Sequence, residues 1–308
     1  MARIVFMGTP SFAVPPLQAL IAEGHEVAVV VTQPDRPAGR SGVPRPSPIK
    51  ELALAHGLPV WQPDHLRGEA VERLRGLTPT VIVVAAYGEI LRPAVLAIPP
   101  HGCLNLHASL LPRHRGASPI VAALLSGDSE TGVTMMQMDA GMDTGAIVAQ
   151  QSLPLTGQER QGELTARLAE LAAGLLRRTL PEWLAGWITP QPQEDARASY
   201  CPVLRREDGQ IDWTRPAPYI ERMTRAYDPW PGAFTFLRGR RLHIWRASVL
   251  PQSIPLPPGT LTRHGHDLVA STGDGALLLE EVQLEGKRRL RTVEFLQGQH
   301  GLEETRLG

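Results

Sequence analysis

The chain has 308 residues, enough for two domains, and 43% of them are hydrophobic, which excludes an intrinsically disordered chain. Lys and Arg total 31, as do Asp and Glu, so a grossly basic nucleic-acid binder is excluded and any RNA contact requires local basic clusters. The two cysteines, Cys103 and Cys201, are too few for a disulfide framework or a Cys-rich zinc site. No apolar run reaches about 18 residues, and the first residues enter a strand-like run without a signal-peptide pattern, so a cytoplasmic protein is expected.

Short apolar runs alternate with helical patterns through the first hundred residues. Strands are predicted at Ile4–Met7, Val27–Val31, Val60–Trp61, Val81–Ala86 and Gly102–Leu106, and helices at Pro15–Ala22, Ile49–His56 and Ala70–Leu74. Continuous apolar strands that alternate with helices are typical of a parallel sheet covered on both faces. The pattern therefore predicts an α/β, Rossmann-like domain with a mostly parallel sheet over residues 1–188, whose ligands lie beyond the carboxyl ends of the strands.

The rest of the chain has a different rhythm. A hairpin is predicted from Gly132–Met138 and Ile147–Leu153, followed by a long helix over Leu164–Trp183. Residues 189–205 contain prolines among polar residues and are predicted to be a linker. After a helix at Tyr219–Tyr227, strands are predicted at Ala233–Leu237, Leu242–Val249, Asp267–Ser271 and Ala276–Val282. Their short, even spacing predicts a smaller, OB-like β-barrel domain over residues 206–308.

The densest polar cluster follows the strand at Gly102–Leu106. Asn105, His107 and Ser109 are spaced two apart, so in a strand they project from one face. Asn105 alone could cap a turn and His107 alone could be a hydrogen-bonded core residue, but together they indicate a ligand cleft at the end of the strand. Asp143 lies in a glycine-bounded loop and is either a turn residue or a carboxylate that orients an imidazole and favours its charged form.

Two stretches resemble a known family. NLHASLLPRHRGASPI, from Asn105 to Ile120, followed by MDAGMDTG, from Met138 to Gly145, is similar to the signature of the formyltransferases that use 10-formyltetrahydrofolate. TQPDRPAGR, VVAAYGEIL and DPWPGAF resemble the members of that family whose acceptor is methionyl-tRNA, and the resemblance covers nearly the whole chain. After PAGR, where many members have a Gly-Lys-Lys-like loop, this chain has the less basic residues 41–45.

The resemblance implies a reaction and a set of site residues. The formyl group would pass from 10-formyltetrahydrofolate, leaving tetrahydrofolate, to the amino group of initiator methionyl-tRNA, in a monomeric enzyme without a metal. The implied catalytic residues are Asn105, His107 and Asp143. The implied folate-binding residues are Ser109, Leu110, Leu111 and Pro112, with Tyr87 and Gly88 as weaker candidates. The proposed tRNA-binding residues are Arg36, Arg40 and Arg45, in a proline-rich loop expected at the carboxyl edge of the sheet.

The implied catalytic residues also suit the chemistry by themselves. Transfer of a formyl group to an amine is acyl transfer in which the substrate supplies the nucleophile, and the chain lacks a G-x-S-x-G elbow. Asn105 and His107 could donate hydrogen bonds to the oxyanion, which is worth on the order of 3 kcal/mol for one donor. A His–Asp pair could move the proton.

Other functions remain open or are excluded by the sequence. A nicotinamide dehydrogenase is excluded because G-x-G-x-x-G is absent after the first strand. The alternatives left open are a folate-dependent amino-sugar formyltransferase and a non-catalytic tRNA-binding module. Four arginines of the second domain could contact phosphates or could be a solvated sheet edge: Arg238, Arg240, Arg241 and Arg246.

Overall fold

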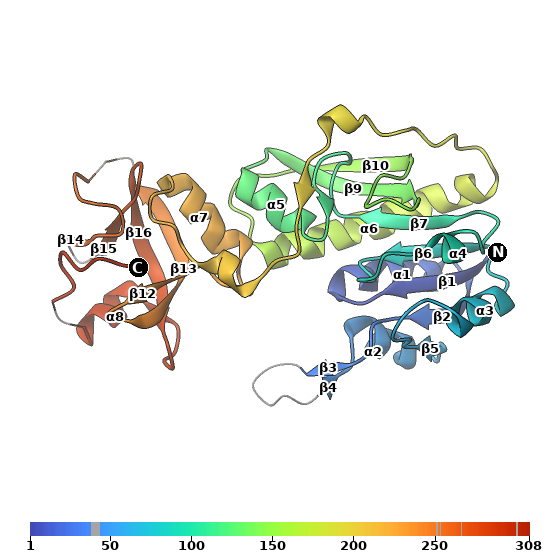
Figure 1. Cartoon of the computed structure of the whole chain (residues 1–308), viewed down its shortest axis with the longest axis horizontal. Helices are drawn as coiled ribbons and strands as arrows, with labels where there is room; N and C mark the ends of the chain where they lie inside the picture. The colour runs from blue at the N-terminus through green and yellow to red at the C-terminus, as the bar shows by residue number, and fades with distance from the viewer. Residues whose placement is uncertain (38–43, 251, 253, 266, 300) are drawn as a thin grey trace. The chain divides into compact units, whose positions relative to one another are not determined.

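The structure is a computed structural model that describes residues 1–37, 44–250, 252, 254–265, 267–299 and 301–308 (Figure 1). By its contacts the chain divides into two compact units. The first unit comprises Met1–Pro119, Glu130–Pro154 and Thr165–Cys201, and the second comprises Ile120–Ser129, Leu155–Leu164 and Pro202–Gly308. The second unit thus includes two segments that precede the end of the first unit in the sequence, so the division is not a single cut in the chain.

The first unit is built on a mixed sheet with the strand order β10-β9-β7-β6-β1-β2-β5. The strands are β1 (Arg3–Gly8), β2 (Glu26–Val31), β5 (Val60–Trp61), β6 (Val81–Ala85), β7 (Cys103–His107), β9 (Glu130–Gln137) and β10 (Ile147–Pro154). The five strands from β7 to β5 are mutually parallel, whereas β9 and β10 run antiparallel at one side. The predicted Rossmann-like, mostly parallel sheet is confirmed.

Both faces of this sheet are apolar because the inner strands are buried on both sides. Val5 and Met7 of β1 share one core with residues of α3 (Glu69–Gly76) and α4 (Pro93–Leu96). Alternation along the strand directs Ile4 and Phe6, which are also fully buried, to the opposite face. The other helices of the chain's first two thirds are α1 (Val14–Ala22), α2 (Pro48–Ala55), α5 (Pro119–Ser126) and α6 (Gln161–Leu184), with a 3₁₀ turn at Ser11–Ala13 before α1. Burial on both faces leaves the strand ends as the place for polar side chains.

The segment that was predicted to be a linker is attached to the first unit as far as Cys201. Its strand β11 (Tyr200–Cys201) pairs in parallel with β8 (Arg115–Gly116), directly after the polar cluster. The Arg115 amide donates to the Ser199 carbonyl at 2.8 Å, and the Ala117 amide donates to the Cys201 carbonyl at 3.1 Å. The segment also contains a 3₁₀ turn at Asp195–Arg197. It therefore forms part of the surroundings of the polar cluster, and the domain limits at 188 and 206 stay a prediction.

The second unit contains an antiparallel sheet with the strand order β12-β13-β16-β15-β14, and β17 pairs with β16. The strands are β12 (Phe234–Leu237), β13 (Arg240–Leu250), β14 (Leu261–His264), β15 (Asp267–Ser271), β16 (Ala276–Leu284) and β17 (Leu290–Arg291). Helix α7 (Ala217–Ala226) packs on β13, and α8 (Thr292–Gln297) packs on β15 and β16. A 3₁₀ turn occupies Arg206–Gly209.

The last residues of the chain join the two edges of this sheet. The Leu307 amide donates to the Gly259 carbonyl at 2.8 Å, beside β14, and the Gly308 amide donates to the Phe236 carbonyl of β12 at 3.1 Å. The curved sheet is thus a half-barrel whose edge strands are bridged by residues 304–308, which refines the predicted OB-like barrel. Among the described residues, no helix has the length and apolar character needed to cross a membrane.

Candidate active site

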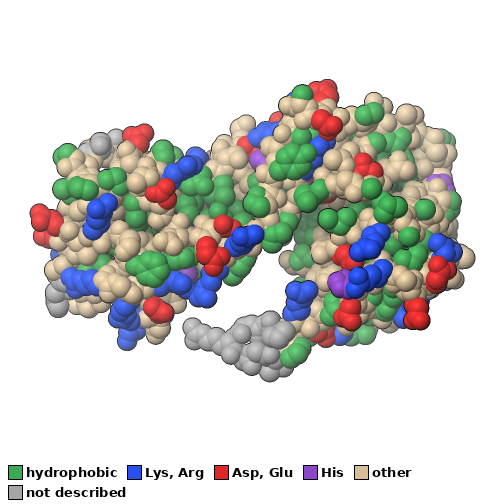
Figure 2. All heavy atoms as spheres, viewed as in Figure 1, with side chains coloured by type: hydrophobic (Ala, Val, Ile, Leu, Met, Phe, Trp, Pro, Cys, Tyr) green, Lys and Arg blue, Asp and Glu red, His purple; other side chains and the backbone are tan. Residues whose placement is uncertain are grey.

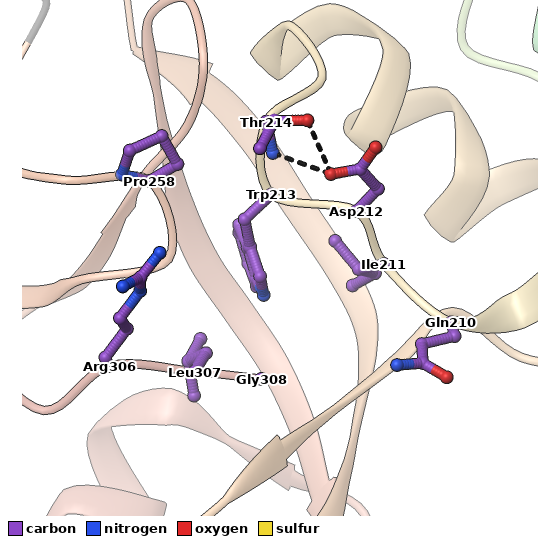
Figure 3. A pocket seen from close by; sticks show the side chains of 9 residues that line it. All are labelled: Gln210, Ile211, Asp212, Trp213, Thr214, Pro258, Arg306, Leu307 and Gly308. Carbon is purple, nitrogen blue, oxygen red and sulfur yellow. Dashed lines mark hydrogen bonds between the residues drawn. The ribbon is translucent and has the colours of Figure 1, made fainter.

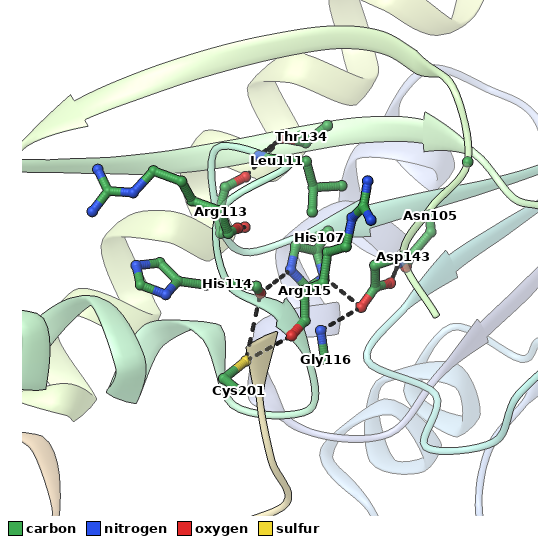
Figure 4. Close-up of polar contacts among 12 residues, drawn as sticks. Asn105, His107, Leu111, Arg113, His114, Arg115, Gly116, Thr134, Asp143 and Cys201 are labelled. Atoms are coloured by element: carbon green, nitrogen blue, oxygen red, sulfur yellow. Dashed lines mark hydrogen bonds and ion pairs between the residues drawn. The ribbon is translucent and has the colours of Figure 1, made fainter. Parts of the chain in front are cut away.

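Strand β7 carries two of the three predicted catalytic side chains to the carboxyl edge of the first unit's sheet. Asn105 pairs with Val84 of β6 on one side and with Met136 of β9 on the other, and His107 is the last residue of the strand. His107 is 6% exposed, whereas Asn105 is half-buried. Since both residues have the same parity along the strand, they lie on one face, as predicted (Figure 4).

Asp143 reaches this face from the loop between β9 and β10. Its Oδ1 accepts a long hydrogen bond of 3.4 Å from Asn105 Nδ2, and its Oδ2 accepts one of 2.8 Å from the Gly116 amide. The same Oδ2 lies 3.6 Å from Nδ1 of His107. Residues distant in sequence therefore meet in one cluster, and Asp143 is more than a turn residue.

The imidazole of His107 is held between two groups of the protein. Its Nε2 lies 2.9 Å from the carbonyl oxygen of His114, and because a carbonyl only accepts, Nε2 carries a proton and donates. Nδ1, facing Asp143, can then gain a second proton, and the resulting imidazolium would pair with the carboxylate. Among the described residues, the second N–H of the Asn105 amide donates to no protein group, so Asn105 is the donor best placed to accept a new ligand.

The predicted folate-binding loop Ser109–Pro112 is held by hydrogen bonds within the first unit. Ser109 is 1% exposed, and its hydroxyl donates to the Arg113 carbonyl at 2.6 Å. The buried Thr134 hydroxyl donates to the Ser109 carbonyl at 2.7 Å and accepts from the Leu111 amide at 3.1 Å. These hydrogen bonds hold the shape of the loop, and the Leu111 carbonyl also accepts from Gln150 Nε2 at 2.9 Å. Thr134 is a supporting residue that the sequence did not indicate.

The second predicted folate segment, Tyr87–Gly88, follows β6 at the same edge. The Tyr87 side chain is only 2% exposed, its hydroxyl has no hydrogen-bond partner, and burial raises the pKa of its phenol. The Tyr87 carbonyl accepts from the Thr9 hydroxyl at 3.0 Å, and Gly88 has a φ of +93°, which suits glycine. The Tyr87 ring is therefore a core group, and only the backbone of this segment is available to a ligand.

The predicted tRNA-binding loop forms a short hairpin at the same edge, because it follows β2. In it, β3 (Arg36–Pro37) pairs with β4 (Pro44–Arg45), which places Arg36 directly opposite Arg45. The loop's acid, Asp35, is already neutralised: Lys50 Nζ lies 2.6 Å from its Oδ2, and the hydrogen bond from Lys50 lowers the pKa of Asp35. Arg40 lies outside the described residues.

A hollow of about 810 Å³ adjoins this hairpin. Its lining residues are Gln33, Pro34, Arg36, Asp64, His65 and Arg67. Elsewhere on the face drawn in Figure 2, basic and acidic side chains are interspersed rather than gathered into one field of a single sign. The net charge of zero is therefore compatible with a small local excess of arginine beside the sheet edge.

In the second unit, three of the four arginines singled out by the sequence already contact protein groups. Arg240 donates to the Glu285 carbonyl at 2.9 Å, Arg238 donates to the Gly301 carbonyl, and Arg241 lies over the Phe234 ring at 4.6 Å. Arg246 is exposed and contacts no acidic group among the described residues. Arg246 is therefore the arginine of this set that is most available to a phosphate.

The second unit also has a hollow of about 470 Å³ (Figure 3). Trp213, Arg306 and Gly308 are among its lining residues. Asp212 lines it too, but its Oδ1 already accepts from the amide and the hydroxyl of Thr214 at 3.0 and 2.6 Å. This carboxylate stabilises a local turn, and the hollow has no cluster of chemistry-bearing side chains.

Comparison with known proteins identifies the class to which this site belongs. The model of a family described as formyl transferase matches residues 2–180, and that of the formyl transferase C-terminal domain matches residues 203–300. The chain therefore belongs to the formyl transferase family, and the predicted resemblance is confirmed.

Individual relatives are more specific. The chain is 52% identical over 307 residues to the methionyl-tRNA formyltransferase of Chloroflexus aggregans, which covers 98% of this chain and 99% of the relative. A methionyl-tRNA formyltransferase structure from Clostridium thermocellum is 18% identical, with a TM-score of 0.58 over 92% of this chain and 99% of that chain. An N-formyltransferase from Helicobacter canadensis, solved with folinic acid and dTDP-3-aminofucose, is 16% identical, with a TM-score of 0.69 over 91% of this chain and 99% of that chain. Both structures support the fold.

Proposed function

We propose that this enzyme transfers the formyl group of 10-formyltetrahydrofolate to the amino group of initiator methionyl-tRNA. The observation that carries the proposal is the meeting of Asn105, His107 and Asp143 at the carboxyl edge of the parallel sheet, within contacts of 3.4 and 3.6 Å. Ligands of such folds bind at this edge. The strong identity to methionyl-tRNA formyltransferases over the full length supports this acceptor.

The three residues divide the chemistry of acyl transfer. The methionyl nitrogen attacks the formyl carbon, and the oxyanion that forms takes a hydrogen bond from the unused N–H of Asn105, which is worth on the order of 3 kcal/mol. The attacking amine loses a proton, and the folate nitrogen gains one as its bond to the formyl carbon breaks. His107 and Asp143 assist this proton transfer, and general acid–base catalysis of this kind typically accelerates a reaction by about 10²–10⁴.

The folate donor would be held beside these residues by the loop Ser109–Pro112 and by the backbone of Tyr87 and Gly88. Leu110 and Pro112 complete that loop, and its shape is held by two hydrogen bonds with Thr134, one accepted from the Leu111 amide and one donated to the Ser109 carbonyl. A pre-formed loop suits a rigid bicyclic ligand, because less conformational entropy is lost on binding. These contacts are part of the proposal.

The acceptor RNA would be bound by basic groups of the hairpin, for which the described residues show no counter-charge. Arg36 and Arg45 face each other in the hairpin, and like charges directly opposite are destabilising unless an anion lies between or beside them. Because Asp35 is paired with Lys50, it does not compensate either arginine. A phosphate of the tRNA acceptor end fits this charge, and Arg40 is proposed to contribute as well.

One assay separates the candidate acceptors. Formyl-labelled 10-formyltetrahydrofolate is supplied with methionyl-tRNA, uncharged tRNA and an amino-sugar nucleotide in parallel reactions. We expect label on methionyl-tRNA alone. Label on the amino sugar would favour the alternative formyltransferase, and RNA binding without label on any acceptor would favour a non-catalytic RNA-binding module.

A further inference from the structure

The backbone of Asp143 has an unusual conformation that requires support. Its φ is +53°, in the left-handed region that residues with a side chain seldom adopt. The backbone conformation of Asp143 determines the direction of its carboxylate, which contacts Asn105 and His107. A group that fixes the Asp143 carbonyl therefore also fixes the direction of its side chain.

Gln193 provides that support from the segment before Cys201. Its Nε2 donates to the carbonyl oxygens of Asp143 at 2.8 Å and of Gly145 at 2.7 Å. Both amide hydrogens of one side chain thus hold the loop on either side of Thr144. The loop also passes close to the chain at Gly145, where only glycine fits, because a Cβ there would lie 1.9 Å from the Gln137 carbonyl oxygen.

Arg115 explains why the Gln193 amide points this way. The guanidinium donates to Gln193 Oε1 from Nε at 3.0 Å and from Nη2 at 2.8 Å, so the oxygen end of the amide is fixed and the NH₂ end must face the loop. Arg115 is 1% exposed, and its guanidinium also donates to the Tyr200 hydroxyl and to Asp195 Oδ1. The side chain of Asp195 is 84% exposed and therefore compensates the buried charge only weakly. Burial of a charge costs free energy unless hydrogen bonds and a counter-charge compensate it, so the two hydrogen bonds to Gln193 Oε1 are part of what holds Arg115 in this position.

We propose that Gln193 is a positioning residue for Asp143, with Arg115 orienting its amide. The inference rests on the proposed function of Asp143, and it assigns to the segment before Cys201 a part in catalysis. Among the described residues, Gln193 makes no hydrogen bond to Asn105 or His107, so we infer that it affects the reaction through the loop that carries Asp143. Outer residues that orient reacting groups typically change activity by about 10–100-fold when they are altered.

The test is a double-mutant cycle in single-turnover formyl transfer. Gln193→Ala and Gln193→Glu are each measured alone and combined with Asp143→Asn. Glu retains the contact with Arg115 but turns an oxygen toward two carbonyl oxygens, so it keeps the fold and loses the support. We expect each single Gln193 variant to lower kcat roughly 10–100-fold with KM values nearly unchanged. In the Asp143→Asn background, the same change should have an effect of less than about twofold.

Two controls separate positioning from general damage. Gln191→Ala, two residues upstream, removes a side chain whose one hydrogen bond among the described residues goes to the nearby Thr189 carbonyl, and it should match the wild type. The NMR resonance of the His107 ring should shift in both Gln193 variants and in Asp143→Asn but not in Gln191→Ala. This signal reports the position of Asp143 whichever acceptor the enzyme uses.

The outcomes are distinct. A wild-type enzyme that labels no methionyl-tRNA refutes the proposed function, and the His107 resonance then still decides the role of Gln193. Equal losses in the wild-type and Asp143→Asn backgrounds, an unshifted His107 resonance, or failure of both Gln193 variants to fold would overturn the positioning role.

Discussion

The Oδ2 atom of Asp143 lies 3.6 Å from Nδ1 of His107 and simultaneously accepts a 2.8 Å hydrogen bond from the Gly116 amide. One carboxylate oxygen therefore faces both the imidazole and the strand β8, which follows the proposed catalytic residues of β7 in the sequence. The amide fixes the oxygen in place, and the imidazole is the group that can change its charge. We therefore expect turnover to depend more on the charge of the side chain at position 143 than on its size.

Asp143→Asn should lower turnover by about 10²–10⁴ while the protein stays folded, because it is nearly isosteric but removes the charge opposite His107. Turnover is measured with saturating methionyl-tRNA and 10-formyltetrahydrofolate, and folding by thermal unfolding. The matched control is Asp139→Asn in the same loop, where the carboxylate is exposed and accepts from Gly141 and Thr144. Near-normal turnover in a folded Asp143→Asn enzyme would remove Asp143 from the catalytic set.

Arg36→Ala should weaken methionyl-tRNA binding and make it less dependent on salt. If Arg36 contacts one phosphate, the slope of log K against log salt concentration should fall in magnitude by roughly 0.7–0.9. Folate binding should not change. Arg75→Ala is the control, because Arg75 is an exposed arginine of α3 that pairs with Glu72 at 2.6 Å. An unchanged slope for Arg36→Ala would show that the hairpin makes no phosphate contact there.

Gly116→Ala should cost both stability and activity. A Cβ at this position would lie 2.2 Å from the Cys201 carbonyl oxygen, and the φ of +116° disfavours any residue with a side chain. Displacement of the Gly116 amide would also release the Asp143 carboxylate. Gly157→Ala is the comparison, since its φ is +82° but its Cβ would meet nothing within 4 Å.

Chemical denaturation should therefore give a cost of about 1–2 kcal/mol for Gly157→Ala, from backbone strain alone, and a clearly larger cost for Gly116→Ala. Gly157→Ala should keep full turnover per folded molecule. Similar costs for the two variants would contradict the steric conflict between β8 and β11.

His243→Phe should reduce the loss of stability that the second unit shows as the pH falls. Burial, followed by the nearby Arg241 and Arg206, lowers the pKa of His243 below its ordinary value of 6.5. As the pH falls below 6.5, His243 takes up a proton in the unfolded chain but stays neutral in the folded chain. The wild type therefore loses stability from that pH downward. Phe keeps a ring against Trp245, whose centroid is 5.1 Å away, and removes a buried Nδ1 that has no partner.

The measurement compares the unfolding midpoints at about pH 7.5 and about pH 5.5, which bracket the ordinary titration of histidine. The midpoint should drop less in His243→Phe than in the wild type, whereas the exposed His56→Gln should behave as the wild type does. An identical drop in the wild type and in His243→Phe would mean that His243 titrates alike in the folded and unfolded chains.

Much of the proposed catalytic centre could be predicted, because the residues on β7 follow from local sequence patterns. The alternation of Asn105 and His107 on a strand that ends at His107 follows from a period of two and from the rule that buried parallel strands are apolar. The strands and helices of the sheet were likewise predictable, because continuous apolar runs between helical patterns admit few other arrangements. The antiparallel second domain was evident from short runs separated by glycine and proline.

The sequence by itself determined which residue types carry the chemistry and on which elements they lie. The tertiary structure decided their partners: Asp143 meets His107 across 36 residues, Gln193 meets Asp143 across 50, and Tyr87 turns into the core instead of toward a ligand. The periodicity of the sequence does not predict such contacts, because they depend on how loops fold back over a sheet. A polar run with prolines is typical both of a free linker and of a strand such as β11 laid beside β8, and only the hydrogen bonds to Arg115 and Ala117 distinguish the two.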